Sequence, residues 1–151
     1  MGLNDLQQRI GRGSIIALDT VTFIYHFEDN PQYAPLTQVV FDAIEGGQVT
    51  AVTSMITVAE VLTGAKKAGH PLILQYRALF AGYPNLTIVP VDMQIAERAS
   101  DMRCQYGLKM PDVITLATAL VCGAQALVTN DRNFTRVTEL AVILLSDYVG
   151  G

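Results

Sequence analysis

Short apolar runs alternate with longer segments of helical periodicity along almost the whole chain, and this alternation constrains the fold more than any other feature. A run that is apolar throughout is typical of a strand buried on both faces of a sheet. Strands separated by helices are parallel, because each helix carries the chain back to the edge where the next strand starts. The sequence therefore predicts an α/β domain with three layers, in which helices cover both faces of a central parallel sheet of about five strands.

The individual elements follow from apolar periodicity and from residues that cap helices. Strands are predicted at 14–19, 49–53, 86–89, 125–129 and 142–145. Helices are predicted at 20–27, 33–45, 56–67, 71–80, 93–106 and 111–121, with a helical turn at 132–137. Ser54 and Asp92 are predicted N-caps, and Pro111 suits the first turn of its helix. The crossovers between strands are expected to be right-handed.

Two segments bear on location. The opening segment 1–13, MGLNDLQQRIGRG, is interpreted as a polar tail or a short extra helix ahead of a domain at 14–151. It lacks the apolar core of a signal peptide, so we expect a cytoplasmic protein. The segment 113–130 carries no charge, but it contains threonines, a glycine and a glutamine. This composition favours a buried helix, a turn and a buried strand over a membrane span.

Composition limits the classes of function. The chain has 151 residues, of which 50% are hydrophobic and 16% charged, which indicates one folded domain rather than a disordered chain. Its 14 acidic residues outnumber 10 basic ones, which argues against a broad basic surface for phosphate backbones. Cys104 and Cys122 show no metal-binding spacing, and both are expected to be small buried residues in a reducing compartment.

Four acidic residues fall at one edge of the predicted sheet. Asp19 ends the first strand, and Asp131 follows the fourth strand by two residues. Asp112 opens the helix that leads into the fourth strand, and Glu60 lies one turn into the helix after the second strand. In a parallel sheet these positions share the carboxyl edge, where open α/β sheets bind ligands. The topology therefore predicts that the four carboxylates converge.

Converging carboxylates repel one another, so they need protons or cations for neutralisation. Oxygen ligands without histidine or cysteine suit Mg²⁺ or Mn²⁺, ions that commonly activate water and stabilise charge on a phosphoryl group. The residues thus predict metal-dependent cleavage of phosphodiesters. Each acid also has a structural alternative: a cap or turn for Asp19, a solvated helix position for Glu60, a first-turn acid for Asp112 and an ordinary turn for Asp131.

Four segments carry a resemblance to a known family. They read IIALDTVTFIYHFE, TSMITVAEVL, MPDVITLATAL and VTNDRNF, and each contains one of the four acids. In order, spacing and apolar setting they resemble the PIN domain, specifically small bacterial toxins of the VapC type. The resemblance extends from about Ile15 to Tyr148. Residues 1–13 lie outside it.

The resemblance implies a magnesium- or manganese-dependent endoribonuclease that cleaves RNA. It implies that Asp19, Glu60, Asp112 and Asp131 are the acidic metal-site residues, and it suggests a supporting polar role for Thr129. Proteins of this type are usually dimers. They are neutralised by a small antitoxin protein, a segment of which lies across the active-site groove.

The sequence departs from the family pattern just after the first acid. The family often has asparagine or serine where this chain has Val21, and Thr22 occupies a position that is usually apolar. A hydrogen bond near Asp19 is therefore either missing or supplied by Thr20 or Thr22. Arg132 follows the last acid, and we weigh two interpretations of it, a contact to the substrate phosphate and an ordinary surface arginine.

Two alternatives to the ribonuclease differ in class. The fold could persist without the chemistry, as a catalytically weakened PIN-like domain that binds RNA or protein. A phosphatase of the haloacid-dehalogenase type would use Asp19 as its nucleophile. That mechanism needs a second aspartate two residues later, where this chain has Val21.

Overall fold

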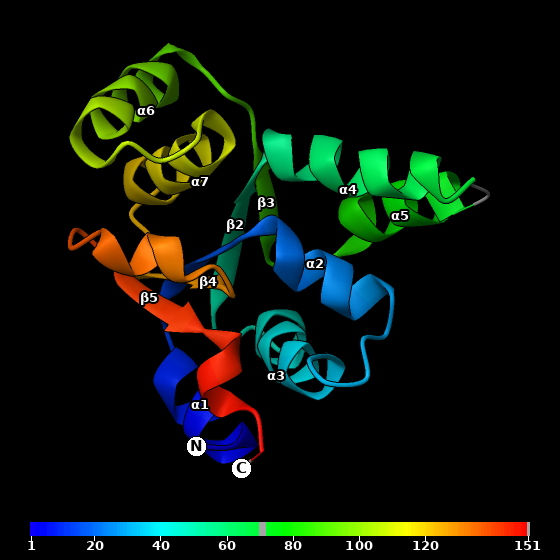
Figure 1. Cartoon of the computed structure of the whole chain (residues 1–151). Coiled ribbons are helices and arrows are strands. Elements are labelled where there is room, and N and C mark those ends of the chain that lie inside the picture. Colours follow the sequence, from blue (N-terminus) through cyan, green and yellow to red (C-terminus); the bar gives the residue numbers. More distant parts are fainter. Residues whose placement is uncertain (70–71, 151) are drawn as a thin grey trace.

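Five parallel strands form the centre of the computed structural model, which describes residues 1–69 and 72–150 (Figure 1). The order in the sheet is β3-β2-β1-β4-β5. The strands are β1 (Ile15–Leu18), β2 (Thr50–Ser54), β3 (Leu86–Val89), β4 (Ala126–Thr129) and β5 (Ala141–Leu144). The predicted α/β class and parallel sheet are confirmed, and each predicted strand is found within one residue of its expected ends.

Strand β1 lies at the centre of the sheet, between β2 and β4. The chain winds outward from β1 through β2 to β3 and then returns to add β4 and β5 on the other side. Leu18 pairs with Val128, so the carboxyl ends of β1 and β4 are level with one another. Such a point, where the winding direction reverses, is where α/β sheets form a ligand-binding crevice.

Helices connect the strands and extend the chain at its start. They are α1 (Leu3–Ile10), α2 (Thr20–Phe27), α3 (Ala34–Glu45), α4 (Met55–Lys67), α5 (Leu72–Gly82), α6 (Met93–Tyr106) and α7 (Met110–Val121). Two short 3-10 helices follow β4 and β5, η1 (Arg132–Arg136) and η2 (Leu145–Tyr148), of which η2 was not predicted. The start predicted for α5, Pro71, lies outside the described residues.

The predicted caps explain where two helices begin. The Ser54 hydroxyl accepts a hydrogen bond from the Ile56 N–H at 3.1 Å, which starts α4 directly after β2. The Asp92 carboxylate accepts from the Ile95 N–H at 2.9 Å and starts α6. Both predicted caps are confirmed, because a side-chain oxygen satisfies a backbone N–H that the helix itself leaves free.

Helices cover both faces of the sheet, as Figure 1 shows. Helices α6 and α7 pack on one face, where Ala17 and Leu127 lie in the same core as Leu116. Helices α1 to α5 contribute to the core on the other face, where Ile16 and Leu18 lie. Neighbouring strand residues therefore point into two different cores, which is why the strands are apolar throughout.

The opening segment is a helix that joins the second of these cores. In α1, Leu6 and Ile10 are 0% and 4% exposed, and the helix packs against α3 and η2. Of the two interpretations of this segment, a polar tail is wrong for residues 3–10 and a short extra helix is what the structure contains. The domain start predicted at residue 14 therefore omits a helix that packs on the core.

The uncharged segment 113–130 runs from α7 through a turn into β4, as expected. Gly123 makes that turn with a φ of +74°, a conformation that favours glycine. Among the helices that the structure describes, none is both long and apolar enough to span a membrane. The expectation that both cysteines are buried is wrong for Cys104, whose side chain is exposed on α6.

Candidate active site at the carboxyl edge of the sheet

Asp19 occupies the junction between β1 and α2 and is 8% exposed. One carboxylate oxygen, Oδ1, accepts a hydrogen bond from the Thr20 N–H at 2.8 Å, and this bond caps α2. The other oxygen, Oδ2, accepts from the Thr129 hydroxyl at 2.7 Å. Asp19 is therefore a helix cap and also a fixed carboxylate at the centre of the carboxyl edge. The cap and the candidate site use the same side chain.

Burial makes the charge on Asp19 costly. Loss of contact with water raises the pKa of Asp19 from 3.8 to about 6. The hydrogen bonds from Thr129 and Thr20 lower the pKa, each by less than burial raises it. The negative charges of Asp112 and Glu60 raise it further, so these three carboxylates lie close enough to repel one another.

Glu60 reaches the same edge from α4. Its carboxylate accepts a hydrogen bond from the Thr20 hydroxyl at 2.8 Å. Thr20 therefore holds Asp19 through its backbone N–H and Glu60 through its hydroxyl. The Thr22 hydroxyl donates to the Val128 carbonyl at 3.3 Å. Neither threonine hydroxyl binds Asp19, so neither supplies the side-chain hydrogen bond that Val21 cannot make. In this structure Thr129 supplies a side-chain hydrogen bond to Asp19.

Asp112 and Asp131 complete the group. Asp112 lies in the first turn of α7, where burial and then the charges of Asp131 and Glu60 raise its pKa, while Lys109 lowers it. The Asp131 N–H donates to the Thr129 hydroxyl at 3.1 Å. The Asp131 side chain accepts from the Asn133 N–H at 2.9 Å and caps η1. The charges that raise the pKa of Asp19 and Asp112 are those of the other predicted acids, so all four lie near the carboxyl edge.

The charge of this group fits a cation. Within residues 1–69 and 72–150 the two ion pairs are Arg98–Glu139 and Arg132–Asp147, and neither involves one of the four acids. Their carboxylates offer the hard oxygen donors that Mg²⁺ and Mn²⁺ prefer. However, no three His, Cys, Asp or Glu side chains in the described part of the chain already form a group able to hold a metal ion. A bound cation would therefore have to draw some of these side chains together.

Arg132 forms an ion pair with Asp147, which is not one of the four acids. Its guanidinium lies 3.4 Å from the Asp147 carboxylate, and both side chains are largely exposed. This geometry matches the surface-arginine interpretation. A contact from Arg132 to substrate phosphate stays a prediction.

Asn130 and Tyr25 are two polar residues beside the four acids that the sequence analysis does not predict as part of the site. The Asn130 amide donates to the Tyr25 hydroxyl at 3.1 Å, and its carbonyl oxygen accepts from the Ser146 N–H at 2.9 Å. Asn130 therefore links the turn after β4 to α2 and to η2. The position of Asn130 between Thr129 and Asp131 indicates a place near the site. Its contact with Tyr25 joins residues 105 apart in sequence, so local sequence does not predict it.

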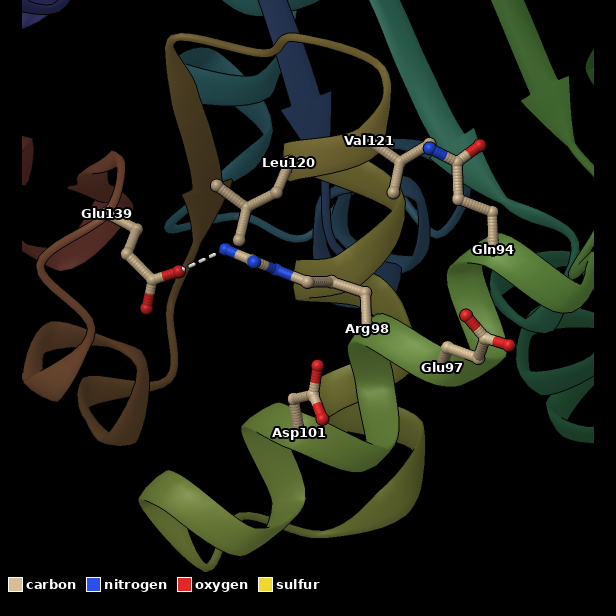
Figure 2. A pocket seen from close by; sticks show the side chains of 7 residues that line it. All are labelled: Gln94, Glu97, Arg98, Asp101, Leu120, Val121 and Glu139. Atoms are coloured by element: carbon tan, nitrogen blue, oxygen red, sulfur yellow. Dashed lines mark hydrogen bonds and ion pairs between the residues drawn. The ribbon is translucent and has the colours of Figure 1, made fainter.

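A separate hollow of about 580 Å³ lies between α6, α7 and the segment before β5 (Figure 2). The pair of Arg98 and Glu139, 2.5 Å apart, lies at this hollow. None of the four predicted acids lines it. The hollow is therefore distinct from the candidate active site.

Comparison with known proteins identifies the fold family. Residues 16–140 match the family model described as the PIN domain, and the chain therefore belongs to the PIN domain family. This is a family of nucleases that generally use divalent metals, and the match leaves α1 outside it. No curated protein matches the chain.

Solved structures similar to this chain are VapBC toxin–antitoxin complexes and VapC toxins. A toxin–antitoxin complex from Klebsiella pneumoniae is 26% identical, with a TM-score of 0.67 over 86% of this chain and 97% of that one. DNA-bound VapBC from Salmonella typhimurium is 22% identical, with a TM-score of 0.68 over 87% and 98%. The sarcin–ricin loop cleaving toxin VapC20 from Mycobacterium tuberculosis is 15% identical, with a TM-score of 0.67 over 80% and 93%. The predicted resemblance to the PIN domain is confirmed.

Proposed function

We propose that the protein is a divalent-metal-dependent endoribonuclease and acts in the cytoplasm as the toxin of a toxin–antitoxin pair. The observation that carries the proposal is the buried Asp19 carboxylate, which Asp112 and Glu60 repel and which forms no ion pair with any residue of 1–69 or 72–150. A protein keeps such a costly arrangement where it serves function more often than where it serves stability. Membership of the PIN domain family and the similarity to VapC toxins support RNA cleavage as the proposed reaction.

We assign the metal to Asp19, Asp112 and Asp131, with Glu60 as a direct or water-mediated ligand. Bound Mg²⁺ or Mn²⁺ would activate a water molecule and stabilise negative charge on the phosphoryl group. The chain's own residues orient the ligands. The Thr129 hydroxyl fixes Asp19, and the Thr20 hydroxyl fixes Glu60.

Protonation also follows from this arrangement. With a pKa of about 6, Asp19 carries a proton in part of the metal-free molecules at slightly acidic pH. A cation that binds Asp19 has to displace this proton, so metal binding weakens as the pH falls toward 6. Ribonuclease activity is therefore expected to decline below that pH.

The test is cleavage of RNA by the purified protein. We expect cleavage with Mg²⁺ or Mn²⁺ and none with EDTA, and Asp19→Asn and Asp112→Asn each abolish it while circular dichroism stays unchanged. Asp101→Asn is the matched control, because it makes the same chemical change at an exposed position of α6. Full activity of both Asp19→Asn and Asp112→Asn overturns the assignment. RNA binding without cleavage by the wild type supports the weakened binding module instead.

Two protein partners belong to the same proposal, a cognate antitoxin and a second copy of the chain. Large apolar side chains are exposed close to the carboxyl edge, among them Met55, Met93 and Met110, which are 44%, 74% and 48% exposed. Leu74 on α5 is 73% exposed, although Tyr76 and Phe80 on the same helix are buried. Some apolar side chains of α4 and α5 thus cover the core, and others are exposed and available to a partner.

A further inference from the structure

A stacked pair of tyrosines lies beside the candidate active site. The rings of Tyr25 and Tyr33 are nearly parallel, 15° apart, with centroids separated by 4.5 Å. Both side chains are partly exposed, so the pair reaches the surface. The pair takes no part in the proposed metal site.

Hydrogen bonds fix this pair in place. The Asn30 side chain accepts from the Tyr33 N–H at 3.0 Å, and the Asn30 N–H donates to the Tyr25 carbonyl at 2.9 Å. The turn between α2 and α3 is thereby folded back so that Tyr33 covers Tyr25. A ring pair that is already ordered loses little conformational entropy when a ligand stacks on it.

A hydrogen bond also connects the pair to the residue next to one of the acids. The Tyr25 hydroxyl accepts a hydrogen bond from Asn130, the residue directly before Asp131. Tyr25 lies six residues beyond Asp19, about 9 Å along the axis of α2. The pair is thus within reach of a nucleotide next to a bond cleaved at the acids.

The chemistry of the pair suits a nucleobase. Aromatic rings stack on every base, because each base has a π-face, and single-stranded RNA is commonly bound in this way. In the part of the chain that the structure describes, neither tyrosine hydroxyl donates a hydrogen bond, so both could donate to the RNA. The chain contains no tryptophan, so tyrosine is the largest aromatic residue it can offer.

We propose that Tyr25 and Tyr33 form a stacking platform for a nucleobase that flanks the cleaved phosphodiester of single-stranded RNA. This inference rests on the proposed ribonuclease function and adds a binding subsite to it. Its consequence is that efficient cleavage requires a base, of any identity, at one position beside the scissile bond.

The experiment removes the base and the ring, separately and together. An RNA oligonucleotide that contains a mapped cleavage site is prepared intact and with single abasic positions on either side. One abasic position is expected to lower kcat/KM of the wild type by roughly 5- to 150-fold, the range for one base–aromatic stack. Tyr33→Leu is expected to show a similar loss on intact RNA and little further loss on that abasic RNA.

Control variants separate stacking from folding. Tyr33→Phe keeps the ring and is expected to restore sensitivity to the abasic position. Tyr106→Leu removes another partly exposed tyrosine, on α6, and is expected to behave as the wild type. Melting temperatures are compared for all variants, because both rings of the pair also pack at the margin of the core. Equal sensitivity of Tyr33→Leu and wild type to every abasic position overturns the platform.

Binding of the same oligonucleotides, measured by fluorescence anisotropy, separates this inference from the proposed function. If the wild type cleaves no RNA, the abasic series is made in an arbitrary single-stranded oligonucleotide instead. Binding with an abasic dependence that Tyr33→Leu loses then keeps the base-stacking site and overturns the ribonuclease. If the wild type neither cleaves nor binds RNA, both fall. If it cleaves with no dependence on flanking bases, only the platform falls.

Discussion

Replacing Asp19 with asparagine is expected to stabilise the metal-free protein, although Asp19 is buried and hydrogen-bonded. Folding moves this carboxylate out of water, and two neighbouring carboxylates repel it. Asparagine is uncharged and nearly the same shape. Its carbonyl oxygen can still accept from the Thr20 N–H, and its amide can donate to the Thr129 hydroxyl. The substitution therefore removes a buried charge and can keep one hydrogen bond to Thr20 and one to Thr129, with the donor and acceptor of the second reversed.

The magnitude follows from the pKa. The pKa of Asp19 rises from 3.8 to about 6 on folding, which corresponds to about 3 kcal/mol at about 1.4 kcal/mol for each pKa unit. Between these two pH values the folded state binds more protons than the unfolded state, so the free energy of unfolding falls as the pH rises. The penalty is complete above about pH 7 and absent below about pH 3. For a domain of this size, 3 kcal/mol raises the melting temperature by about 6–12 °C.

The assay is thermal and urea unfolding in EDTA at pH 7.5 and at pH 4.5. Asp19→Asn is expected to exceed the wild type by up to about 3 kcal/mol at pH 7.5 and by clearly less at pH 4.5. Asp101→Asn is the control and is expected to stay within about 0.5 kcal/mol of the wild type. Added Mg²⁺ is expected to stabilise the wild type and to have less effect on Asp19→Asn. If Asp19→Asn is no more stable than the wild type at pH 7.5 in EDTA, the argument from burial is wrong.

Two further substitutions test the surroundings of the site and the packing of the opening helix. Thr129→Val keeps the shape of a fully buried side chain but removes the hydrogen-bond partner of Asp19 Oδ2 and of the Asp131 N–H, so urea unfolding is expected to show a loss of about 1–3 kcal/mol. An unchanged stability would contradict this role. Leu6→Ala is expected to cost about 2–5 kcal/mol, because Leu6 is fully buried. Exposed Gln7→Ala is its control, and equal stability of the two variants would show that α1 is not packed.

The strands and most helix ends follow from local sequence, and the convergence of the acids follows from the parallel topology that these elements imply. Ser54 and Asp92 act as caps within two or three residues of their partners, so no long-range information is needed to predict them. The shared edge of Asp19 and Asp131 follows from parallel topology alone, because every strand ends at the same edge. The length and type of these elements were therefore predictable from sequence.

The hydroxyl partners were not predictable, because they depend on register. Thr129 reaches Asp19 because Leu18 lies opposite Val128, and a shift of one residue would turn Thr129 to the other face. Thr20 binds Glu60 instead of compensating for Val21, which depends on how α4 packs beside α2. Such contacts between distant segments require the assembled structure.

The burial of α1 was ambiguous for a different reason. Leu6 and Ile10 are four residues apart, which suits one face of a helix, but the segment is short and otherwise mostly polar. An isolated helix of this length is only marginally stable in water, so it forms here because α3 offers an apolar surface. The apolar positions of α1 can be identified from the sequence, but the surface of α3 against which they pack cannot.

The acid excess and a nucleic-acid substrate are compatible only if the site changes its charge. The chain carries a formal net charge of −4, and four of its carboxylates share the edge where we place RNA. Each divalent ion bound there adds two positive charges at the point where the phosphate has to lie. The same ion would relieve the repulsion that makes ionised Asp19 costly, so the proposed function links metal binding, protein stability and RNA affinity thermodynamically. RNA affinity should therefore rise with metal concentration over the range in which the metal stabilises the fold, a coupling that a constant basic surface would not produce.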